Sequence, residues 1–395
     1  LNLGTDGNWG VKKDSLLGYN SENGNFKPLA FNFDRASSAT VVNQSGLIET
    51  VGSGEPRIDF LGNTKGALLL EPSRSNAITY SEDFSQSVWN KTGLTVSSNQ
   101  IISPDGSLNA DEINITGVNA HYLFDVISVN ASTNYVLTFY AKKGTATDVS
   151  YSIYDNSNSA DIIASTSYYS QISNTNWTRI TVEFTTPSGC TSVRPYPLRD
   201  GSSAGTVYIW GAQLEQGSYA TSYIPTSGQS GGVTRVGDVC NNGANAQVIN
   251  STEGVLYFEG SVFTADGTFR RIGIGTSDNG FANSIQLRYN TIDNSITYQF
   301  RAGNVYQADL TITTNTTIVN KIACVWKINR FEIWVNGVKE AQDTSGSVPT
   351  LNTFDSLFFG KVSASLTEPF KGNVKDLRVY NTALTSAELQ ALTTI

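Results

Sequence analysis

Apolar and polar residues alternate with a period of two along much of this chain, which is typical of β-strands with one buried face. The clearest case is the segment 178–184, in which Ile180, Val182 and Phe184 point to one side and polar residues to the other. Segments of this kind are separated by Asn, Ser and Gly, with no helical period between them. The pattern therefore predicts an all-β fold.

The middle of the chain, residues 76–226, is interpreted as one β-sandwich or jelly roll. Its expected strands are 126–129, 135–142, 149–154, 178–185 and 206–210. The stretch 207–228 closes it, because a Val-Tyr-Ile-Trp strand leads past Pro225 into a Gly- and Ser-rich segment. A final strand followed by such a segment is typical of a domain boundary. We therefore expect a separate module after it.

The last part, residues 253–395, repeats the strand pattern with different turns. Its expected strands are 254–263, 270–275, 284–289, 295–301, 320–328, 330–335 and 377–380. Asn336-Gly337 predicts a type I′ hairpin, since both turn residues must reach positive φ. After these strands the period becomes helical, and Thr385 with Glu388 fits a capping box. A short terminal helix is expected at about 386–392.

The alternation of apolar and polar residues is weakest in the first 75 residues. Residues 1–28 are polar, and 31–71 predict two small hairpins, which do not bury enough apolar area to stand alone. They are expected to pack on a neighbour or on copies of themselves in an oligomer. The predicted division is an attachment and oligomerisation segment at 1–75, a β-sandwich at 76–230, a linker at 231–252, and a second β-sandwich with a short helix at 253–395. The predicted fold class is thus all-β, with two β-sandwich (jelly-roll) domains in tandem after an N-terminal β-hairpin and extended anchoring segment.

The charge and composition of the chain argue against several classes of function. The net charge of −8 argues against nucleic-acid binding, which needs a basic face. No apolar run approaches the roughly 20 residues of a membrane span, and the start has no signal-peptide pattern. The chain contains no Met, so we expect a mature product or the ordered part of a longer polypeptide. Cys190, Cys240 and Cys324 lack zinc-site spacing and are expected to be free or buried.

The sequence contains few residue patterns that are typical of a catalytic site. His121 is the only histidine, and a lone His beside an aromatic run is usually structural. Glycoside hydrolysis needs two carboxylates that flank one sugar. The adjacent pairs Glu82-Asp83 and Asp111-Glu112 would point to opposite faces of a strand. The chain is therefore expected not to be an enzyme.

Glycan binding is the better candidate, because sugars stack on exposed aromatic rings while polar neighbours bond their hydroxyl groups. The strand tryptophans are expected in the cores, whereas tyrosines among polar residues are expected to be exposed. The carbohydrate-binding candidates are Tyr151, Tyr154, Tyr168, Tyr196 and Arg199 in the middle module, and Arg288, Tyr289, Tyr298 and Arg301 in the last one. No cofactor is expected apart from a structural calcium ion, for which Asp376 is the one ligand that can be named.

Several segments carry family resemblances. FDRASSATVVNQSGLIE at 33–49, PRIDF at 56–60, LLLEP at 68–72, Ser75-Asn76 and YSEDF at 80–84 together resemble the leader of tailed-bacteriophage fibre and head-fibre proteins. GAQLEQGSYATSYIPT at 211–226 resembles the end of the carbohydrate-binding-like sandwich that follows that leader. FEIWVNG at 331–337 and FKGNVKDLRVYNTAL at 370–384 are similar to the laminin-G-like, concanavalin-A-like lectin and glucanase superfamily.

These resemblances imply a virion fibre or decoration protein of a tailed phage. Its N-terminal segment would attach to other virion proteins of capsid or tail, and its modules would bind host or environmental glycans. A homotrimer on the virion exterior, assembled in the host cytoplasm, is expected. Two alternatives stay open: a polysaccharide depolymerase whose acids meet only in the fold, and a purely structural spacer or capsid cement.

Overall fold

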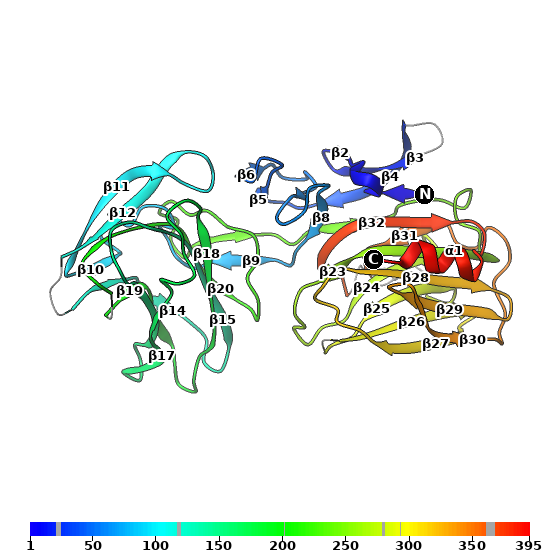
Figure 1. The fold of residues 1–395 in the computed structure, drawn as a ribbon. Coiled ribbons are helices and arrows are strands. Elements are labelled where there is room, and N and C mark those ends of the chain that lie inside the picture. The colour runs from blue at the N-terminus through cyan, green and yellow to red at the C-terminus, as the bar shows by residue number, and fades with distance from the viewer. Residues whose placement is uncertain (21–24, 117–119, 201, 279–280, 293, 361–367) are drawn as a thin grey trace. The chain divides into compact units, whose positions relative to one another are not determined.

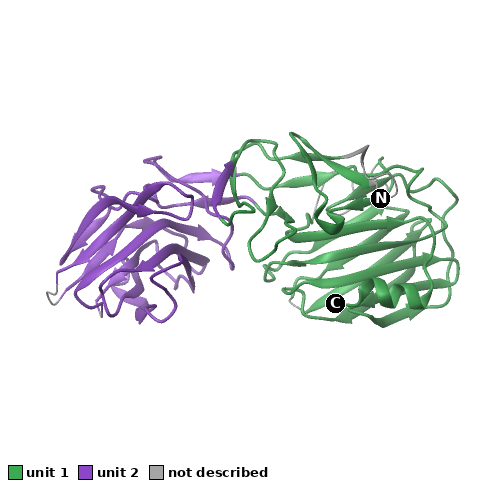
Figure 2. Cartoon of the chain, turned by 45° about the horizontal axis from the view of Figure 1, so that its top comes forward, with its two compact units in different colours: residues 1–46, 51–72, 236–395 green, residues 47–50, 73–235 purple. Residues whose placement is uncertain are grey.

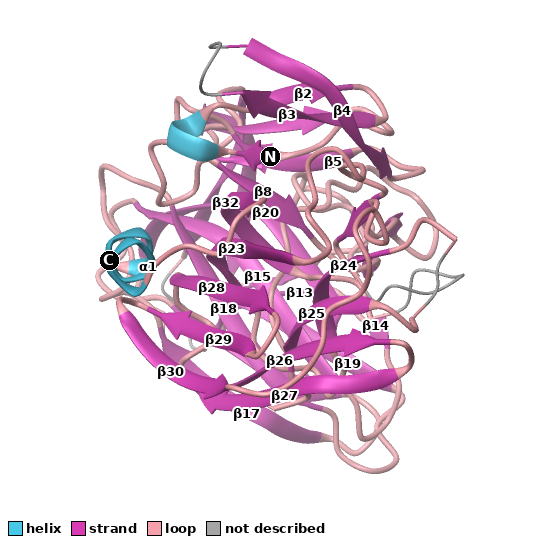
Figure 3. Ribbon diagram, turned by 90° about the vertical axis from the view of Figure 1, so that its right-hand side faces the viewer, coloured by secondary structure: helices cyan, strands magenta, loops and turns pink. Residues whose placement is uncertain are grey.

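The computed structural model describes residues 1–20, 25–116, 120–200, 202–278, 281–292, 294–360 and 368–395. The chain divides into two compact units (Figure 2). Unit 1 comprises residues 1–46, 51–72 and 236–395, and unit 2 comprises residues 47–50 and 73–235. The regular secondary structure of the described part is nearly all β-strand, with one α-helix (Figure 3), so the predicted all-β sandwich class is confirmed. No helix of this part is long and apolar enough to cross a membrane.

Unit 1 contains a large antiparallel sheet, in which twelve strands are described (Figure 1). Its order is β22 (Val239–Asn241), β4 (Asn25–Asp34), β3 (Ser15–Asn20), β1 (Asn2–Leu3), β32 (Gly372–Tyr380), β23 (Glu253–Val262), β28 (Asn320–Lys327), β29 (Arg330–Val335) and β30 (Val338–Asp343). β2 (Gly10–Lys12) pairs with β3, and β8 (Ala67–Leu70) pairs with both β7 (Ile58–Asp59) and β32. A short 3-10 turn, η1 (Thr5–Gly7), follows β1.

A five-stranded sheet forms the second layer of unit 1. Its order is β27 (Val305–Thr313), β26 (Ser295–Ala302), β25 (Ser284–Tyr289), β24 (Arg270–Gly275) and β31 (Ser356–Phe358). Apolar residues at alternate positions of both sheets, such as Phe258, Trp326 and Ile285, share one buried core. The alternation that predicted these strands thus also determines which face of each sheet is buried.

The N-terminal residues belong to unit 1, which corrects the expected separate segment 1–75. Asn2 and Leu3 of β1 pair with β32, and Leu68 of β8 lies opposite Val374 on the same edge of β32. Leu3 of β1, Leu16 of β3 and Leu68 of β8 enter the unit 1 core. The hairpins therefore bury their apolar face against the strands of their own chain.

The expected linker at 231–252 is also structured. β21 (Val233–Arg235) pairs with β9 (Arg74–Asn76) in unit 2, and β22 pairs with β4 in unit 1. Cys240 of β22 is buried in the unit 1 core. Like Cys190 and Cys324, it is a free and buried thiol, as the sequence predicts.

The C-terminal helix α1 (Ser386–Thr393) confirms the predicted capping box. The Thr385 hydroxyl accepts the Glu388 N–H, while the Glu388 carboxylate accepts the Thr385 N–H at 2.8 Å. Leu389 packs with Val255, Ala323, Val325 and Trp334, on the face of the large sheet that lies away from the main core. Asn336 and Gly337 have φ of 50° and 85°, as the predicted type I′ turn requires.

Unit 2 is a sandwich of two antiparallel sheets. One contains β10 (Asn90–Thr92), β13 (Tyr122–Phe124), β19 (Ser192–Arg199), β16 (Ser150–Asp155) and β17 (Ala160–Ser167), with β14 (Ile127–Ser128) beside β19. The other contains β11 (Leu94–Ile102), β12 (Leu108–Ile115), β20 (Gly205–Gln216), β15 (Asn134–Lys143) and β18 (Thr178–Thr185). Residues 39–51 form the predicted hairpin of β5 (Ala39–Val42) and β6 (Ile48–Val51).

The stretch that follows β20 has a structural role. The Asn76 side chain donates to the backbone oxygens of Ala212 (3.1 Å) and Ile224 (2.9 Å). The Glu215 carboxylate accepts the Thr221 N–H at 2.8 Å. These bonds tie residues near the start and the end of the sandwich sequence to β20, so the polar residues of this stretch close the sandwich.

Candidate functional site

Two of the tyrosines predicted to be exposed in unit 2 are packed against the core. Tyr168 is fully buried, and its hydroxyl donates to the Pro197 oxygen at 3.1 Å. The Tyr151 ring stacks on the Tyr168 ring, with 6.2 Å between the centroids. Tyr151 shares the inward face of β16 with Ile153, whereas Tyr154 lies on the opposite face. The expectation of exposure was wrong for Tyr168, because polar neighbours in sequence do not determine which face of a strand a residue occupies.

Tyr154, Tyr196 and Arg199 do come together, on the outward face of the sheet that contains β13, β19, β16 and β17. We call this surface the aromatic–arginine face. It comprises Tyr122 and Phe124 of β13, Arg194, Tyr196 and Arg199 of β19, Ser152 and Tyr154 of β16, and Asp161 of β17. Leu123, Ile153 and Val193 of the same strands point into the core. Alternation therefore places Tyr122 with Phe124 and Arg194 with Tyr196 on this surface, and a break in the β16–β19 register between Tyr196 and Arg199 brings Arg199 to the same side.

Rings and guanidinium groups interleave on the aromatic–arginine face. The Tyr196 ring lies 4.8 Å from the Phe124 ring and 6.0 Å from the Tyr122 ring, between centroids. The Arg194 guanidinium lies 5.0 Å from the Phe124 centroid and 5.5 Å from that of Tyr154. The Arg199 guanidinium lies 5.6 Å from Tyr154 and 4.9 Å from Tyr196. Such stacking fixes both cations while leaving N–H donors at their edges.

The two arginines differ in their charge partners. Arg199 forms an ion pair with Asp161 and donates to the Ser152 hydroxyl at 2.6 Å. Among the residues that the structure describes, Arg194 has no ion-pair or hydrogen-bond partner, and its Nε is buried. Asp200, at the end of β19, accepts the His121 N–H at 3.0 Å, and its hydrogen bond with Tyr122 raises the pKa of that phenol. His121 thus holds Asp200 through a hydrogen bond from its backbone N–H.

Sequence reasoning missed Tyr122 and Phe124 of this face. Tyr122-Leu123-Phe124 alternates around one apolar residue, which is a signal that both aromatic rings share a face. The pairing of β13 with β19, which places Leu123 opposite Leu198, is long-range and cannot be read from the local pattern.

In unit 1, the predicted residues also divide between two faces. Tyr289 and Tyr298 are buried in the core, where the Tyr298 hydroxyl donates to the Val325 oxygen at 2.9 Å. They were wrongly expected at the surface. Arg288 and Arg301 lie on the outward face of the five-stranded sheet with Arg271, Gln286, Thr297 and Gln299, and we call these six residues the arginine–glutamine face. This face too combines cations with rings, since the Arg301 guanidinium lies 4.5 Å from the Phe281 centroid and 4.7 Å from that of Tyr306.

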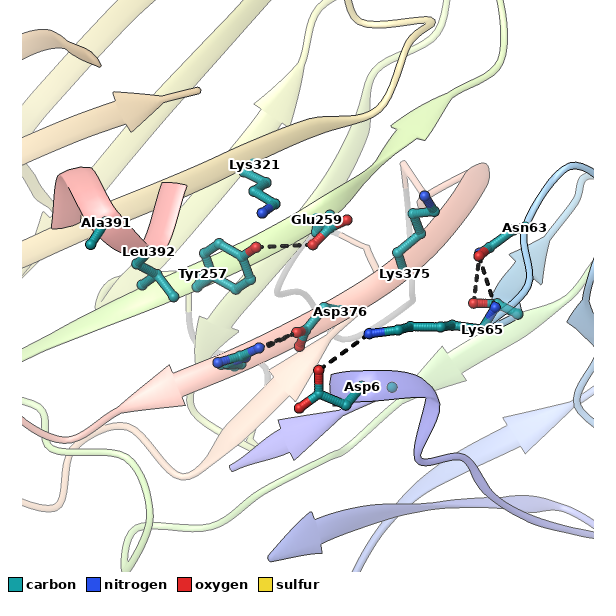
Figure 4. A pocket seen from close by; sticks show the side chains of 13 residues that line it. Asp6, Asn63, Lys65, Tyr257, Glu259, Lys321, Lys375, Asp376, Ala391 and Leu392 are labelled. Atoms are coloured by element: carbon teal, nitrogen blue, oxygen red, sulfur yellow. Dashed lines mark hydrogen bonds and ion pairs between the residues drawn. The ribbon is translucent and has the colours of Figure 1, made fainter. Parts of the chain in front are cut away.

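A polar pocket of about 390 Å³ lies against the large sheet of unit 1, beside η1 and α1 (Figure 4). Asp376 lines it, and Arg378 donates two hydrogen bonds to one Asp376 oxygen, at 2.6 and 3.0 Å. The Thr5 hydroxyl donates to the other oxygen at 2.8 Å, and burial raises the pKa of Asp376. Within the described residues there is no cluster of three or more His, Cys, Asp or Glu suited to a metal ion. The structure therefore gives Asp376 an ion-pair role.

Other polar side chains of the pocket also have partners within unit 1. The Lys65 ammonium pairs with Asp6, and the Tyr257 hydroxyl donates to Glu259 at 3.1 Å. Glu259 lies opposite Asp376 across the β23–β32 pair, so the fold brings two carboxylates into this pocket.

Comparison with known proteins agrees with this architecture in part of the chain. Residues 261–390 match the family model described as the concanavalin A-like lectin/glucanases superfamily. The match lies within unit 1 and includes strands of both its sheets. The search of curated proteins finds no match.

Solved structures give further similarities at low identity. The CBM40 domain of Ruminococcus gnavus IT-sialidase bound to alpha2,3 sialyllactose is 15% identical, covering 36% of this chain and 83% of that one, with a TM-score of 0.30. The N-terminal CBM22 tandem of Paenibacillus barcinonensis Xyn10C is 9% identical, covering 80% and 100%, with a TM-score of 0.28. The enzymatically active domain of bacteriophage CBA120 tailspike protein 4 is 16% identical, covering 36% and 21%, with a TM-score of 0.27.

Proposed function

We propose that the protein is an adhesion protein that binds saccharides through the aromatic–arginine face of unit 2. The observation that carries this proposal is the joining of Tyr122, Phe124 and Tyr154 with two ring-stacked arginines on one outward sheet surface. Aromatic edges and faces match the apolar C–H surfaces of sugars, while guanidinium, hydroxyl and carboxylate groups bond the sugar hydroxyls. Rings held by strands need little reordering when a ligand binds.

A glycan array tests this proposal with the full chain displayed in many copies, since multivalency raises the avidity of weak sites. The expected result is binding to a defined set of saccharides, with a roughly tenfold loss of affinity in Tyr154→Ala. Tyr306→Ala is the matched control, because Tyr306 also contacts an arginine but lies in unit 1. An array without binding at high avidity would favour the purely structural role instead.

The proposal includes binding without catalysis. Asp161 and Asp200, the carboxylates at the aromatic–arginine face, already bond Arg199 and the His121 N–H. The depolymerase alternative rests on Glu259 and Asp376 in the unit 1 pocket. An assay for new reducing ends, run with every saccharide that binds, is expected to stay at background. Release that Glu259→Gln abolishes would establish the depolymerase instead.

The biological setting that we propose is the exterior of a tailed-phage particle, as a fibre or decoration protein. Its support is the resemblance of residues 33–84 to phage fibre leaders. In that setting the N-terminal segment attaches to a capsid or tail protein, and three copies assemble. The mass of the full chain in solution tests the trimer, and a monomer at micromolar concentration would contradict it.

A further inference from the structure

We propose that the aromatic–arginine face selects anionic saccharides, and that Arg194 binds their charged group. This inference rests on the saccharide binding proposed above and adds the class of ligand. The shared chemistry is an anionic oxygen group, which the carboxylate of an acidic sugar or a sulfate ester can supply.

The first argument is the missing counterion. Arg199 has Asp161 as its partner on the same face. Arg179, on the other sheet of unit 2, stacks on Tyr140 and donates to the Thr138 hydroxyl at 3.0 Å. Arg194 stacks in the same way, yet it has neither an ion-pair nor a hydrogen-bond partner in the described residues. A half-buried cation loses part of its hydration, so an anionic ligand would restore interactions that the protein itself does not provide.

The second argument is the order of the Arg194 side chain. Phe124 contacts its guanidinium from β13, and Tyr154 contacts it from β16. A cation fixed between two rings loses little conformational freedom when it binds, and its planar donors suit carboxylate and sulfate oxygens.

The third argument is that the neighbouring acidic side chains form hydrogen bonds or ion pairs with residues other than Arg194. Asp161 bonds Arg199, and Asp200 bonds the His121 N–H and Tyr122. Asp155 points inward, where it accepts the Asn158 side-chain N–H at 2.7 Å. Although the chain carries a net charge of −8, none of these carboxylates forms an ion pair with Arg194. Salt screens long-range repulsion more strongly than such a close contact.

Binding of the full chain to three polymers tests the inference: polygalacturonate, dextran sulfate and neutral galactan, measured by calorimetry at two salt concentrations. We expect one or both polyanions to bind, and Arg194→Gln to weaken that binding about 10- to 100-fold, the usual range for losing a charged hydrogen bond. Arg179→Gln is the matched control and is expected to leave affinity unchanged. Binding of polygalacturonate alone identifies a carboxylate site, and binding of dextran sulfate alone identifies a sulfate site.

Asp161→Asn provides a second measurement that does not depend on the Arg194 variant folding. This change removes a carboxylate from the face and frees Arg199, so polyanion affinity is expected to rise severalfold. Unchanged polyanion binding in both variants overturns the inference. A third outcome is that neutral galactan binds, and that this binding is weakened by Tyr154→Ala but not by Arg194→Gln. That result would overturn the preference for anionic saccharides while supporting saccharide binding. If no saccharide binds, either on the glycan array or in these calorimetric titrations, both proposals are overturned.

Discussion

Arg35 and Asp238 form a buried ion pair, with 3.0 Å between Nη1 and Oδ1, although 203 positions separate them in sequence. Arg57 binds the other Asp238 oxygen and also pairs with Glu71 at 2.7 Å. The Glu71 N–H donates to Asp238 as well, at 2.8 Å. These charges lie where the chain leaves unit 1 after residue 72 and re-enters it at 236. The cluster thus holds together the two strands that border the insertion of unit 2.

Asp238→Asn is expected to destabilise unit 1 by about 3–5 kcal/mol, because it leaves two buried arginines without their shared carboxylate. Calorimetry should show a lower melting temperature for the unit 1 transition and an unchanged one for unit 2. The matched control is Asp6→Asn, which removes the exposed pair with Lys65 and is expected to change stability by at most about 0.5 kcal/mol. Equal effects of the two substitutions would contradict the role assigned to the cluster.

The stability of unit 2 is expected to depend on pH through Asp111. Its carboxylate accepts the N–H groups of Phe84 and Asn99, and burial raises its pKa to about 6. The folded protein therefore holds this proton more tightly than the unfolded one, whose pKa is about 4. The free energy of unfolding should then fall as pH rises from about 4 to about 6. Glu82, whose pKa burial also raises, acts in the same direction.

Calorimetry of the unit 2 transition across this pH range checks the sign. Asp83, whose pKa is lowered, acts only below about pH 4, outside the window. Asp111→Asn should flatten the pH dependence between about 4 and 6, at some loss of stability at every pH because one backbone N–H loses its acceptor. Stability that rises with pH across this window would show that Asp111 is not the controlling group.

The terminal helix is expected to depend on one buried side chain. Leu389→Ala should lower the stability of unit 1 by about 2–5 kcal/mol, since Leu389 is fully buried against Trp334 and its neighbours. Thr385→Ala removes only the cap and should cost about 1 kcal/mol. Denaturant unfolding followed by tryptophan fluorescence measures both. A cap effect as large as the core effect would contradict this division.

Chelation is expected to leave unit 1 unchanged. Both Asp376 oxygens are engaged by Arg378 and Thr5, so EDTA should not alter the melting temperature. Added calcium should not alter it either, whereas Arg378→Gln should lower it, because the buried Asp376 then loses its cation. A calcium-dependent rise in the melting temperature would instead identify a structural ion in the unit.

Local patterns predicted many of the strands, the terminal helix and the Asn336-Gly337 turn, because those features depend on neighbouring residues, but the expected strands did not include β11, β12, β17, β19 or β27. They did not predict that β1 and β8 complete the edge of β32, since that pairing joins positions more than 300 residues apart. The burial of Tyr298 was missed for a different reason, because the local pattern did contain a signal for it. Ile296 and Phe300 share its parity and are buried with it, a stronger signal than its polar neighbours. Tyr154 and Arg199 were predicted and lie on the aromatic–arginine face, whereas Tyr196, predicted with them, is buried. The Arg194 side chain became informative only when the contacts around it were known.

The most direct test of the account is calorimetric titration of one array-selected saccharide into the full chain, Tyr154→Ala and Tyr306→Ala. Tyr154 lies on the aromatic–arginine face of unit 2, and Tyr306 contacts Arg301 of the arginine–glutamine face of unit 1. The account predicts that Tyr154→Ala loses roughly tenfold in affinity and that Tyr306→Ala matches the unmodified chain. A loss confined to Tyr306→Ala, with Tyr154→Ala unaffected, would contradict it and place the saccharide site on unit 1.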